Sequence, residues 1–217
     1  MAVQVAGDQY MGLDGQLHEI KRQMRQSGGY PFDPEKLKEL LQRAVEGRFD
    51  DNQRWHEEGD VIYLSVTSNG MTGPQWIEHL EKLGFHLSAY AKSVLHSPNF
   101  KPTNGVKYEV AILKGTLFKD EDRVTKKIRT DAIGRKLEKP NAELACLIRE
   151  NFSDEEIEAM GLWWIIVMHE PIEDSDGLLR LLGASRDGNG RWLNAYYDNP
   201  DFGWSRDIGF AFVVSQV

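Results

Sequence analysis

The spacing of apolar residues separates the first sixty positions from the rest of the chain. Residues 1–32 are polar and glycine-rich around one short helical candidate at 17–24. A clearer helix follows, because Asp33 can cap it, Pro34 lies where a missing N–H costs nothing, and apolar residues recur at helical spacing through 37–45. The charged stretch 48–60 has the composition of a connection. We therefore expect residues 1–60 to form a helical N-terminal arm.

The remaining residues, 61–217, have the patterning of a compact domain. Helix starts are marked by two capping boxes, Thr72 with Gln75 and Ser153 with Glu156. Other segments are assigned by apolar periodicity. They are a strand at 61–66, a short helix opened by Ser88, a strand at 108–113, a mixed-charge helical stretch at 119–139 and a helix at 142–150.

The last quarter of the chain is rich in predicted strands. The continuous apolar run 162–168, bounded by Gly161 and Pro171, is typical of a central strand. Three more strands are expected at 178–184, 191–197 and 208–215, separated by turns rich in Gly, Asn and Asp. Helices segregated from a late, mainly antiparallel sheet predict an α+β fold rather than a doubly wound α/β fold.

Composition narrows the classes of function. The chain has 217 residues, 41% of them hydrophobic and 28% charged, as expected of a globular protein. Its net charge of −8 argues against nucleic-acid binding by the molecule as a whole, because that affinity depends on Lys and Arg at phosphates. A single cysteine, Cys146, and the lack of an apolar signal segment favour a cytoplasmic location. The run 162–168 is too short to span a bilayer, so no membrane role is expected.

Candidate catalytic and metal-binding motifs are weak. His169 and Glu170 resemble an acid–base pair, but neighbours in a strand point to opposite faces, and no HExxH spacing occurs. The acidic run 173–177 fails the calcium-loop pattern at its first and twelfth positions, Ile172 and Gly183. We predict no catalytic residue, metal or cofactor. A small enzyme using His169 and Glu170, helped by Arg186 or Asp187, stays an alternative.

Two other features have a structural and a functional interpretation. Cys146 lies on the apolar side of its helix, where a free cysteine behaves as a small hydrophobic residue. The stretch 119–139 carries many basic residues, but acidic residues among them cancel much of the field, which favours a solvated helix face. A nucleic-acid-associated protein that uses 119–139 is the remaining alternative.

Aromatic residues crowd into the C-terminal 26 positions. They are Trp192, Tyr196, Tyr197, Phe202, Trp204, Phe210 and Phe212, interleaved with short polar side chains. Stiff rings beside hydrogen-bonding side chains are typical of recognition surfaces, and loops on a rigid sheet often carry them. We expect the segment 196–207 to be a long loop that turns its rings outward. The opposing interpretation is that Trp192 and Trp204 only cover the sheet.

The C-terminal segments 181–186, 190–197 and 207–214 resemble the ending of C-type-lectin-fold proteins of the formylglycine-generating-enzyme type. In those proteins a glycine-and-tryptophan strand, a polar aromatic loop and a closing Gly-Phe-x-x-Val strand build the ligand face. The Asn-, Tyr- and Asp-rich version is similar to the variable proteins of diversity-generating retroelements. Residues 65–168 resemble bacterial proteins of no described function. Ala211 replaces an arginine usual in the enzyme family and the tail has no cysteine, so oxidase chemistry is not implied.

The resemblance implies a C-type-lectin-like domain at 61–217 that binds a protein or other macromolecule through a diversifiable surface. The ligand-binding residues expected from the aromatic pattern and the resemblance are Asn189, Arg191, Trp192, Asn194, Tyr196, Tyr197, Asp198, Asn199, Phe202, Trp204, Ser205, Asp207 and Ile208.

Overall fold

The computed structural model describes residues 54–187 and 190–214, together with positions 15, 17, 18, 21, 22, 37, 38, 41, 42 and 45. The chain divides into two compact units, Met1–Gln53 and Arg54–Val217. In the first unit the described positions are helical, in keeping with the two helices expected there. The rest of that arm, and Asn189 of the expected ligand face, lie outside the described residues.

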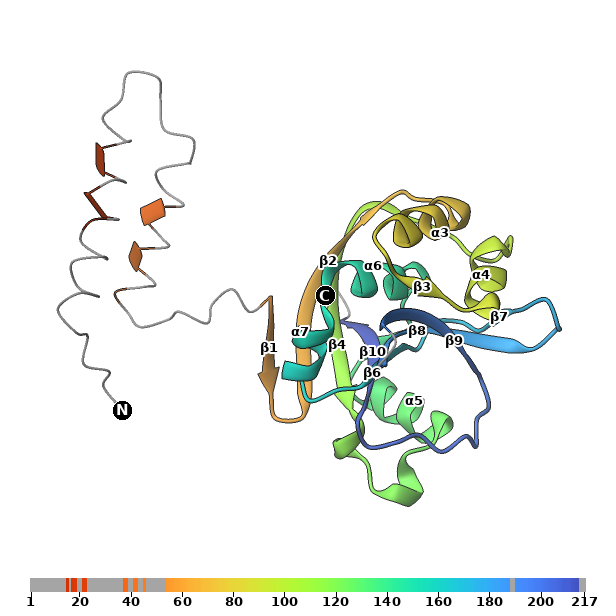
Figure 1. Ribbon diagram of the computed structural model, residues 1–217. Coiled ribbons are helices and arrows are strands. Elements are labelled where there is room, and N and C mark those ends of the chain that lie inside the picture. Colours follow the sequence, from red (N-terminus) through yellow and green to blue (C-terminus); the bar gives the residue numbers. More distant parts are fainter. Residues whose placement is uncertain are drawn as a thin grey trace. The chain divides into compact units, whose positions relative to one another are not determined.

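The second unit is a mixed α and β structure built on one large sheet (Figure 1). Its helices are α3 (Gly73–Lys82), α4 (Ala89–His96), α5 (Thr125–Gly134), α6 (Glu143–Asn151) and α7 (Asp154–Ala159), with 3-10 turns at Gly115–Leu117 and Asp120–Asp122. Its strands are β1 (Trp55–Glu58), β2 (Val61–Asn69), β3 (His86–Leu87), β4 (Asn104–Lys114), β5 (Leu137–Glu138), β6 (Trp164–Val167), β7 (Ile172–Glu173), β8 (Leu179–Asp187), β9 (Gly190–Tyr197) and β10 (Ile208–Val214).

The sheet has the strand order β1-β2-β4-β10-β6-β8-β9-β3, with β5 paired to β10 and β7 to β8. Pairing is antiparallel except for β10 with β6 and β3 with β9. The α+β class is therefore confirmed. The expectation that the sheet is confined to the C-terminal region is wrong. Strand β10 lies between β4 and β6 and so joins early and late strands in one sheet.

Two expected boundaries need correction. The sheet begins before Val61, because Trp55–Glu58 pairs with β2 and is not a connection. The stretch 119–139 is not one helix: a 3-10 turn, α5 and the short strand β5 divide it. Both capping boxes are confirmed, since the side chains of Gln75 and Glu156 accept hydrogen bonds from the N-cap backbones.

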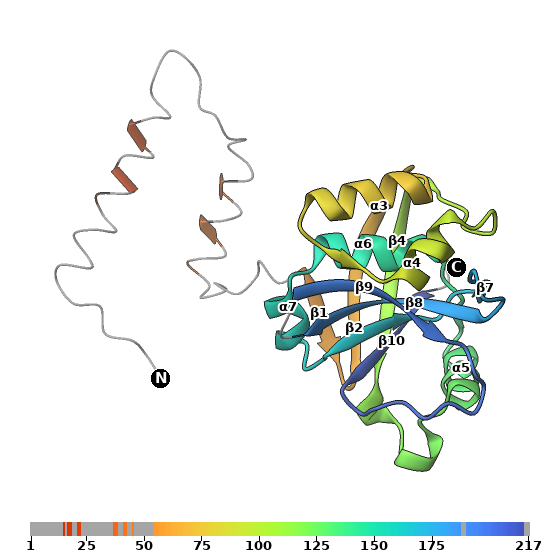
Figure 2. The ribbon, with the colours of Figure 1, turned by 45° about the vertical axis from the view of Figure 1, so that its right-hand side comes forward.

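Each face of the sheet has its own apolar core, because successive residues of a strand point to opposite sides. Figure 2 shows α3, α4 and α6 on one face and α5 on the other. On β6, Ile165 and Val167 belong to the first core, whereas Ile166 belongs to the second, with Phe210 and Ile128 of α5. The period-two alternation thus assigns each strand residue to one helical layer.

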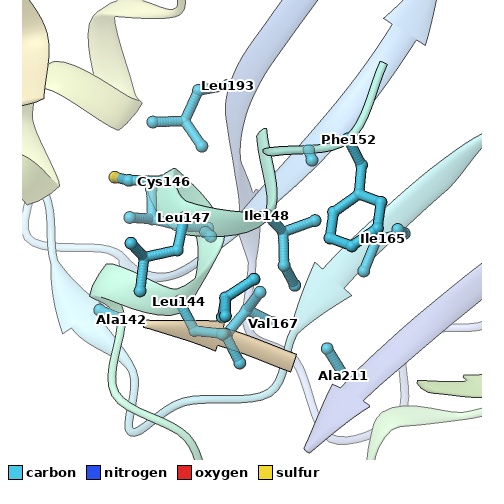
Figure 3. Close-up of a cluster of buried hydrophobic side chains, with 14 of the residues drawn as sticks. Ala142, Leu144, Cys146, Leu147, Ile148, Phe152, Ile165, Val167, Leu193 and Ala211 are labelled. Carbon is cyan, nitrogen blue, oxygen red and sulfur yellow. The ribbon is translucent and has the colours of Figure 1, made fainter. Parts of the chain in front are cut away.

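Helix α6 fills the middle of the first core. Its Leu144, Cys146, Leu147 and Ile148 lie among side chains of β6, β9 and β10 (Figure 3). Cys146 is fully buried, and burial raises the pKa of its thiol well above the ordinary value. The expectation that this cysteine packs as a hydrophobic residue is confirmed.

Within the described part of the chain, no helix has the length and apolar character required to cross a bilayer.

Candidate functional site: an aromatic pocket beside the 198–207 loop

A pocket of about 470 Å³ lies between the sheet and the loop that joins β9 to β10. That size is within the range of small-ligand sites, roughly 300–1,000 Å³. Its walls are mainly aromatic. They comprise Trp164, Ala195, Tyr196, Tyr197, Phe202, Gly203, Trp204, Ser205 and Ile208.

The floor of the pocket is the α5 face of the sheet. Trp164, Tyr196 and Ile208 all belong to the core on this face. The rings of Trp164 and Tyr196 lie 5.6 Å apart between centroids. They approach over Gly183, where a Cβ would lie only 3.0 Å from the Tyr196 ring and 2.9 Å from the Ile165 carbonyl oxygen. A glycine at 183 therefore lets Tyr196 lie flat enough to complete the floor.

Trp204 anchors the loop over this face. Its side chain is 6% exposed, and its indole Nε1–H donates to Thr125 Oγ1 at 3.0 Å. Its ring lies edge-on to Tyr196, Phe202 and Phe210, at centroid distances of 6.2, 4.7 and 5.9 Å. The expectation that Trp204 faces solvent is thus wrong, because its hydrogen-bonded ring fills the space under the loop, although one side of it still lines the pocket.

The loop also supplies acceptors to the first turn of α5. Thr125 N and Lys126 N, which have no partner inside the helix, donate to the carbonyls of Phe202 and Pro200 at 3.3 and 2.9 Å. Trp204 N donates to the Arg123 carbonyl at 2.9 Å. The loop is therefore fixed by backbone hydrogen bonds on the side away from the pocket.

Arg123 connects the loop to the 3-10 turn Gly115–Leu117. The guanidinium is largely buried and donates to the carbonyls of Gly115 and Phe118 at 2.8 and 2.9 Å. Gly115 itself touches the loop, since a Cβ there would lie 2.8 Å from the carbonyls of Ser205 and Arg206. These contacts make the loop a rigid part of the domain.

Asp198 and Asn199 shape the start of the loop. Asp198 forms an ion pair with Arg129 of α5, with N–O distances of 3.1 and 3.2 Å, and its side chain is buried. Asn199 Oδ1 accepts from Asp201 N at 2.9 Å, and Asn199 O accepts from Phe202 N. Both side chains have structural partners. If they bound a ligand as expected, they would have to give up contacts that fix the start of the loop.

One ring at the pocket rim is open to solvent. Phe202 is 45% exposed and lines the pocket. Tyr197 is equally exposed and also lines the pocket, but strand alternation directs its ring to the α3 side. Tyr196 and Trp164 are half-buried. An anchored loop with an exposed ring at its rim offers contact area at little entropic cost, because the loop need not be ordered when a ligand enters.

The other expected ligand residues divide between the two faces. Ser205 and Ile208 line the pocket. Trp192 stacks on His86 at 4.8 Å, and Asn194 donates to Ser185 Oγ at 2.9 Å, both on the pocket face beside it.

Arg191 is the expected ligand residue that lies on the wrong face. Its guanidinium stacks on Phe85, 4.1 Å from the ring centroid, and donates to the Leu83 carbonyl. The even–odd alternation of β9 places it on the α3 side, away from the pocket. Asp207 is half-buried, and its carbonyl accepts from Trp163 N.

His169 and Glu170 do not form a converging pair. His169 is 1% exposed; its Nδ1–H donates to the Glu170 carbonyl and its Nε2 accepts from Leu182 N at 2.9 Å. Desolvation lowers its pKa to about 4. The Glu170 side chain is exposed and pairs with Lys139. Arg186 pairs with Glu158 and stacks on Trp163. This geometry disfavours the enzyme alternative.

The basic residues of 119–139 are mostly neutralised by acidic partners. Lys126, Lys127 and Arg129 of α5 pair with Asp201, Asp122 and Asp198, Arg135 at the C-cap of α5 pairs with Asp131, and Arg123 pairs with Asp120. The interpretation of this segment as a solvated face, on which acidic residues offset the basic ones, therefore accounts for its many Lys and Arg residues. Among the described residues, no group of three or more His, Cys, Asp and Glu side chains is placed to hold a metal ion.

Sequence reasoning missed Ala195 and Gly203 of the pocket wall, as well as three residues that have side-chain roles in the site. Trp164 was hidden in the continuous apolar run 162–168, although its even spacing with Ile166 and Met168 places all three on one face. Thr125 and Arg123 lie in the mixed-charge stretch, where no local pattern shows that they bind the loop.

No protein-family model, curated protein or solved structure matches this chain.

Proposed function

We propose that this chain is a binding protein that takes an apolar group of a protein or other macromolecule into the aromatic pocket. The observation that carries the proposal is the combination of four aromatic side chains around one cavity, with that of Phe202 exposed at its rim. Aromatic rings that line a pocket open to water leave apolar surface hydrated, and a ligand that covers them removes this surface from water. No catalytic step is part of the proposal.

The rigidity of the loop supports recognition. Its backbone is bound to α5 and to the 3-10 turn, while its pocket side carries the exposed ring of Phe202. A ligand therefore meets a preformed site, and less binding energy is lost in ordering it.

The finer identity belongs to the same proposal. The order of a tryptophan strand (β9), an aromatic loop and a closing strand with Gly209 and Phe210 (β10) supports a likeness to C-type-lectin-fold variable proteins of diversity-generating retroelements. Side chains at the pocket rim would then be the diversified ones. The buried thiol of Cys146 supports a cytoplasmic location. A reverse transcriptase gene beside a partial copy of the 3′ end of this gene would support the retroelement assignment, and its absence would count against it.

The pocket itself is tested with p-cresol, a single ring without peptide groups. Saturation-transfer NMR should give a dissociation constant on the order of 1 mM for the native chain, the range expected of so small a ligand. Phe202→Ala should weaken binding about fivefold, because an aromatic contact contributes roughly 0.5–1.5 kcal/mol. Tyr90→Ala is the matched control, since Tyr90 is 40% exposed and stacks on Arg180 outside the pocket. Equal effects of the two variants, or no binding at all, would refute the proposal.

A further inference from the structure

The pocket opens onto a length of β9 whose outer edge has no neighbouring strand in the described part of the chain. Strand β3 pairs with β9 only at Trp192 and Leu193. The chain then leaves the edge, because Ser88 caps α4. Residues 194–197 therefore continue beyond the end of β3.

The hydrogen-bond pattern shows which backbone groups point out of the sheet. Ser88 N donates to Leu193 O across the outer edge, so the backbone N–H and C=O of Leu193 point away from β8. Asp198 N donates to Leu179 O, so the backbone N–H and C=O groups of the even-numbered residues of β9 point toward β8. Because the two directions alternate along an antiparallel strand, the N–H and C=O of Ala195 and the N–H of Tyr197 point outward. No hydrogen bond to these three groups is formed within the described residues.

The pocket reaches the same edge. Ala195 packs with the core on the α3 side, and Tyr197, two residues on, lies on that same side. The other walls lie on the α5 side, where Tyr196 and Trp164 pack. Ala195 and Tyr197 nevertheless line the pocket. The cavity is thus continuous with the exposed backbone edge, where these two residues present main-chain groups.

We propose that β9 binds an extended peptide segment of a partner protein by strand addition, with one apolar side chain of the peptide in the aromatic pocket. The complementarity lies in the backbone: two outward donors and one acceptor match the groups of an added strand. Alternate side chains of such a strand point to the α5 face, so the residue beside Tyr196 enters the pocket. This inference rests on the proposed function, because it specifies the ligand of the same pocket.

The test pans the full chain against a displayed library of random short linear peptides. Enriched peptides should share one aromatic or large aliphatic position. Methylation of the peptide amide that faces Ala195 O should weaken binding of the synthesised peptide about fivefold, the share of one backbone hydrogen bond. Methylation of the next amide should change binding less than about twofold, since that group points away from β9.

Ala195→Pro is the matching change in the protein. Proline removes the outward N–H and places its ring on the edge, while the bonds to β8 come from the neighbouring residues, and edge strands tolerate it. The variant should weaken the peptide at least about tenfold. Circular dichroism and a cooperative thermal unfolding transition show whether the variant is folded. If it does not fold, the methylated peptides decide on the native chain.

The experiments distinguish failure of strand addition from failure of the proposed function. Binding of p-cresol with no enriched linear peptide, or with peptides indifferent to both amide methylation and Ala195→Pro, overturns strand addition and leaves the pocket function intact. Failure of p-cresol and of every peptide overturns both.

Discussion

Alanine replacement of Trp204 and of Phe202, one at a time, separates the ring that anchors the loop from the ring that faces solvent. Trp204 is 6% exposed and contacts three other rings, so its removal leaves a cavity and an unpaired Thr125 hydroxyl. Buried Trp→Ala changes cost about 3–5 kcal/mol. Phe202 is 45% exposed, so its replacement removes only about half of a phenylalanine's burial, roughly 1 kcal/mol.

These energies are measured as shifts of the unfolding midpoint by circular dichroism. At about 2–4 °C per kcal/mol for a domain of this size, Trp204→Ala should lower Tm by about 6–20 °C and Phe202→Ala by about 2–4 °C. The conservative change Thr125→Val removes only the acceptor of the indole N–H, and should cost about 1–3 kcal/mol. A loss below 1 kcal/mol in Trp204→Ala, or equal losses in the two alanine variants, would refute the anchoring role of Trp204.

Three further changes test the framework around the site. Gly183→Ala should lower the free energy of unfolding by about 1–3 kcal/mol in urea titration and shift the Tyr196 ring resonances, because the added Cβ meets that ring at 3.0 Å; a neutral effect would contradict the close approach. The pKa of His169 is about 4 in the folded protein against 6.5 ordinarily, so the unfolded chain takes up the proton first as pH falls. Stability should therefore drop by about 3 kcal/mol between pH 7 and pH 4 more than in His169→Gln, and parallel pH profiles would be the contrary result. Cys146 should react with a thiol reagent only in denaturant, and rapid labelling of the native chain would show that it is accessible.

The elements with strong local signals were predictable. The starts of helices α3 and α7 are marked by capping boxes, in each of which two side chains three residues apart fix the first turn, and β10 is marked by a run of alternating residues. These signals are contained in a few consecutive residues. The same holds for the buried state of Cys146, which follows from apolar neighbours on its own helix.

The sheet order was not predictable, because it depends on pairings between distant segments. β10 pairs with residues of β4 about a hundred positions away and with residues of β6 about 44 positions away, and local periodicity does not encode either pairing. The strand β1 was missed because its sequence, Trp-His-Glu-Glu, is polar at an exposed edge of the sheet.

The candidate site was predicted in part for the same reason. The aromatic composition of 196–207 indicates a recognition loop, but it does not tell which ring is buried. Trp204 is distinguished from Phe202 by distant partners, such as Thr125, which lies 79 residues away. Arg191 was placed on the ligand face by its neighbours in sequence, whereas strand alternation turns it to the other side.

The most direct test of the pocket uses the six tryptophan indole N–H resonances of the chain in a titration with p-cresol. We expect the Trp164 and Trp204 resonances to shift together and to saturate with one dissociation constant, because both rings line the pocket. Trp76 in the opposite core and the exposed Trp163 serve as internal controls and should stay in place. Shifts at Trp163 without shifts at Trp164 and Trp204 would contradict the account.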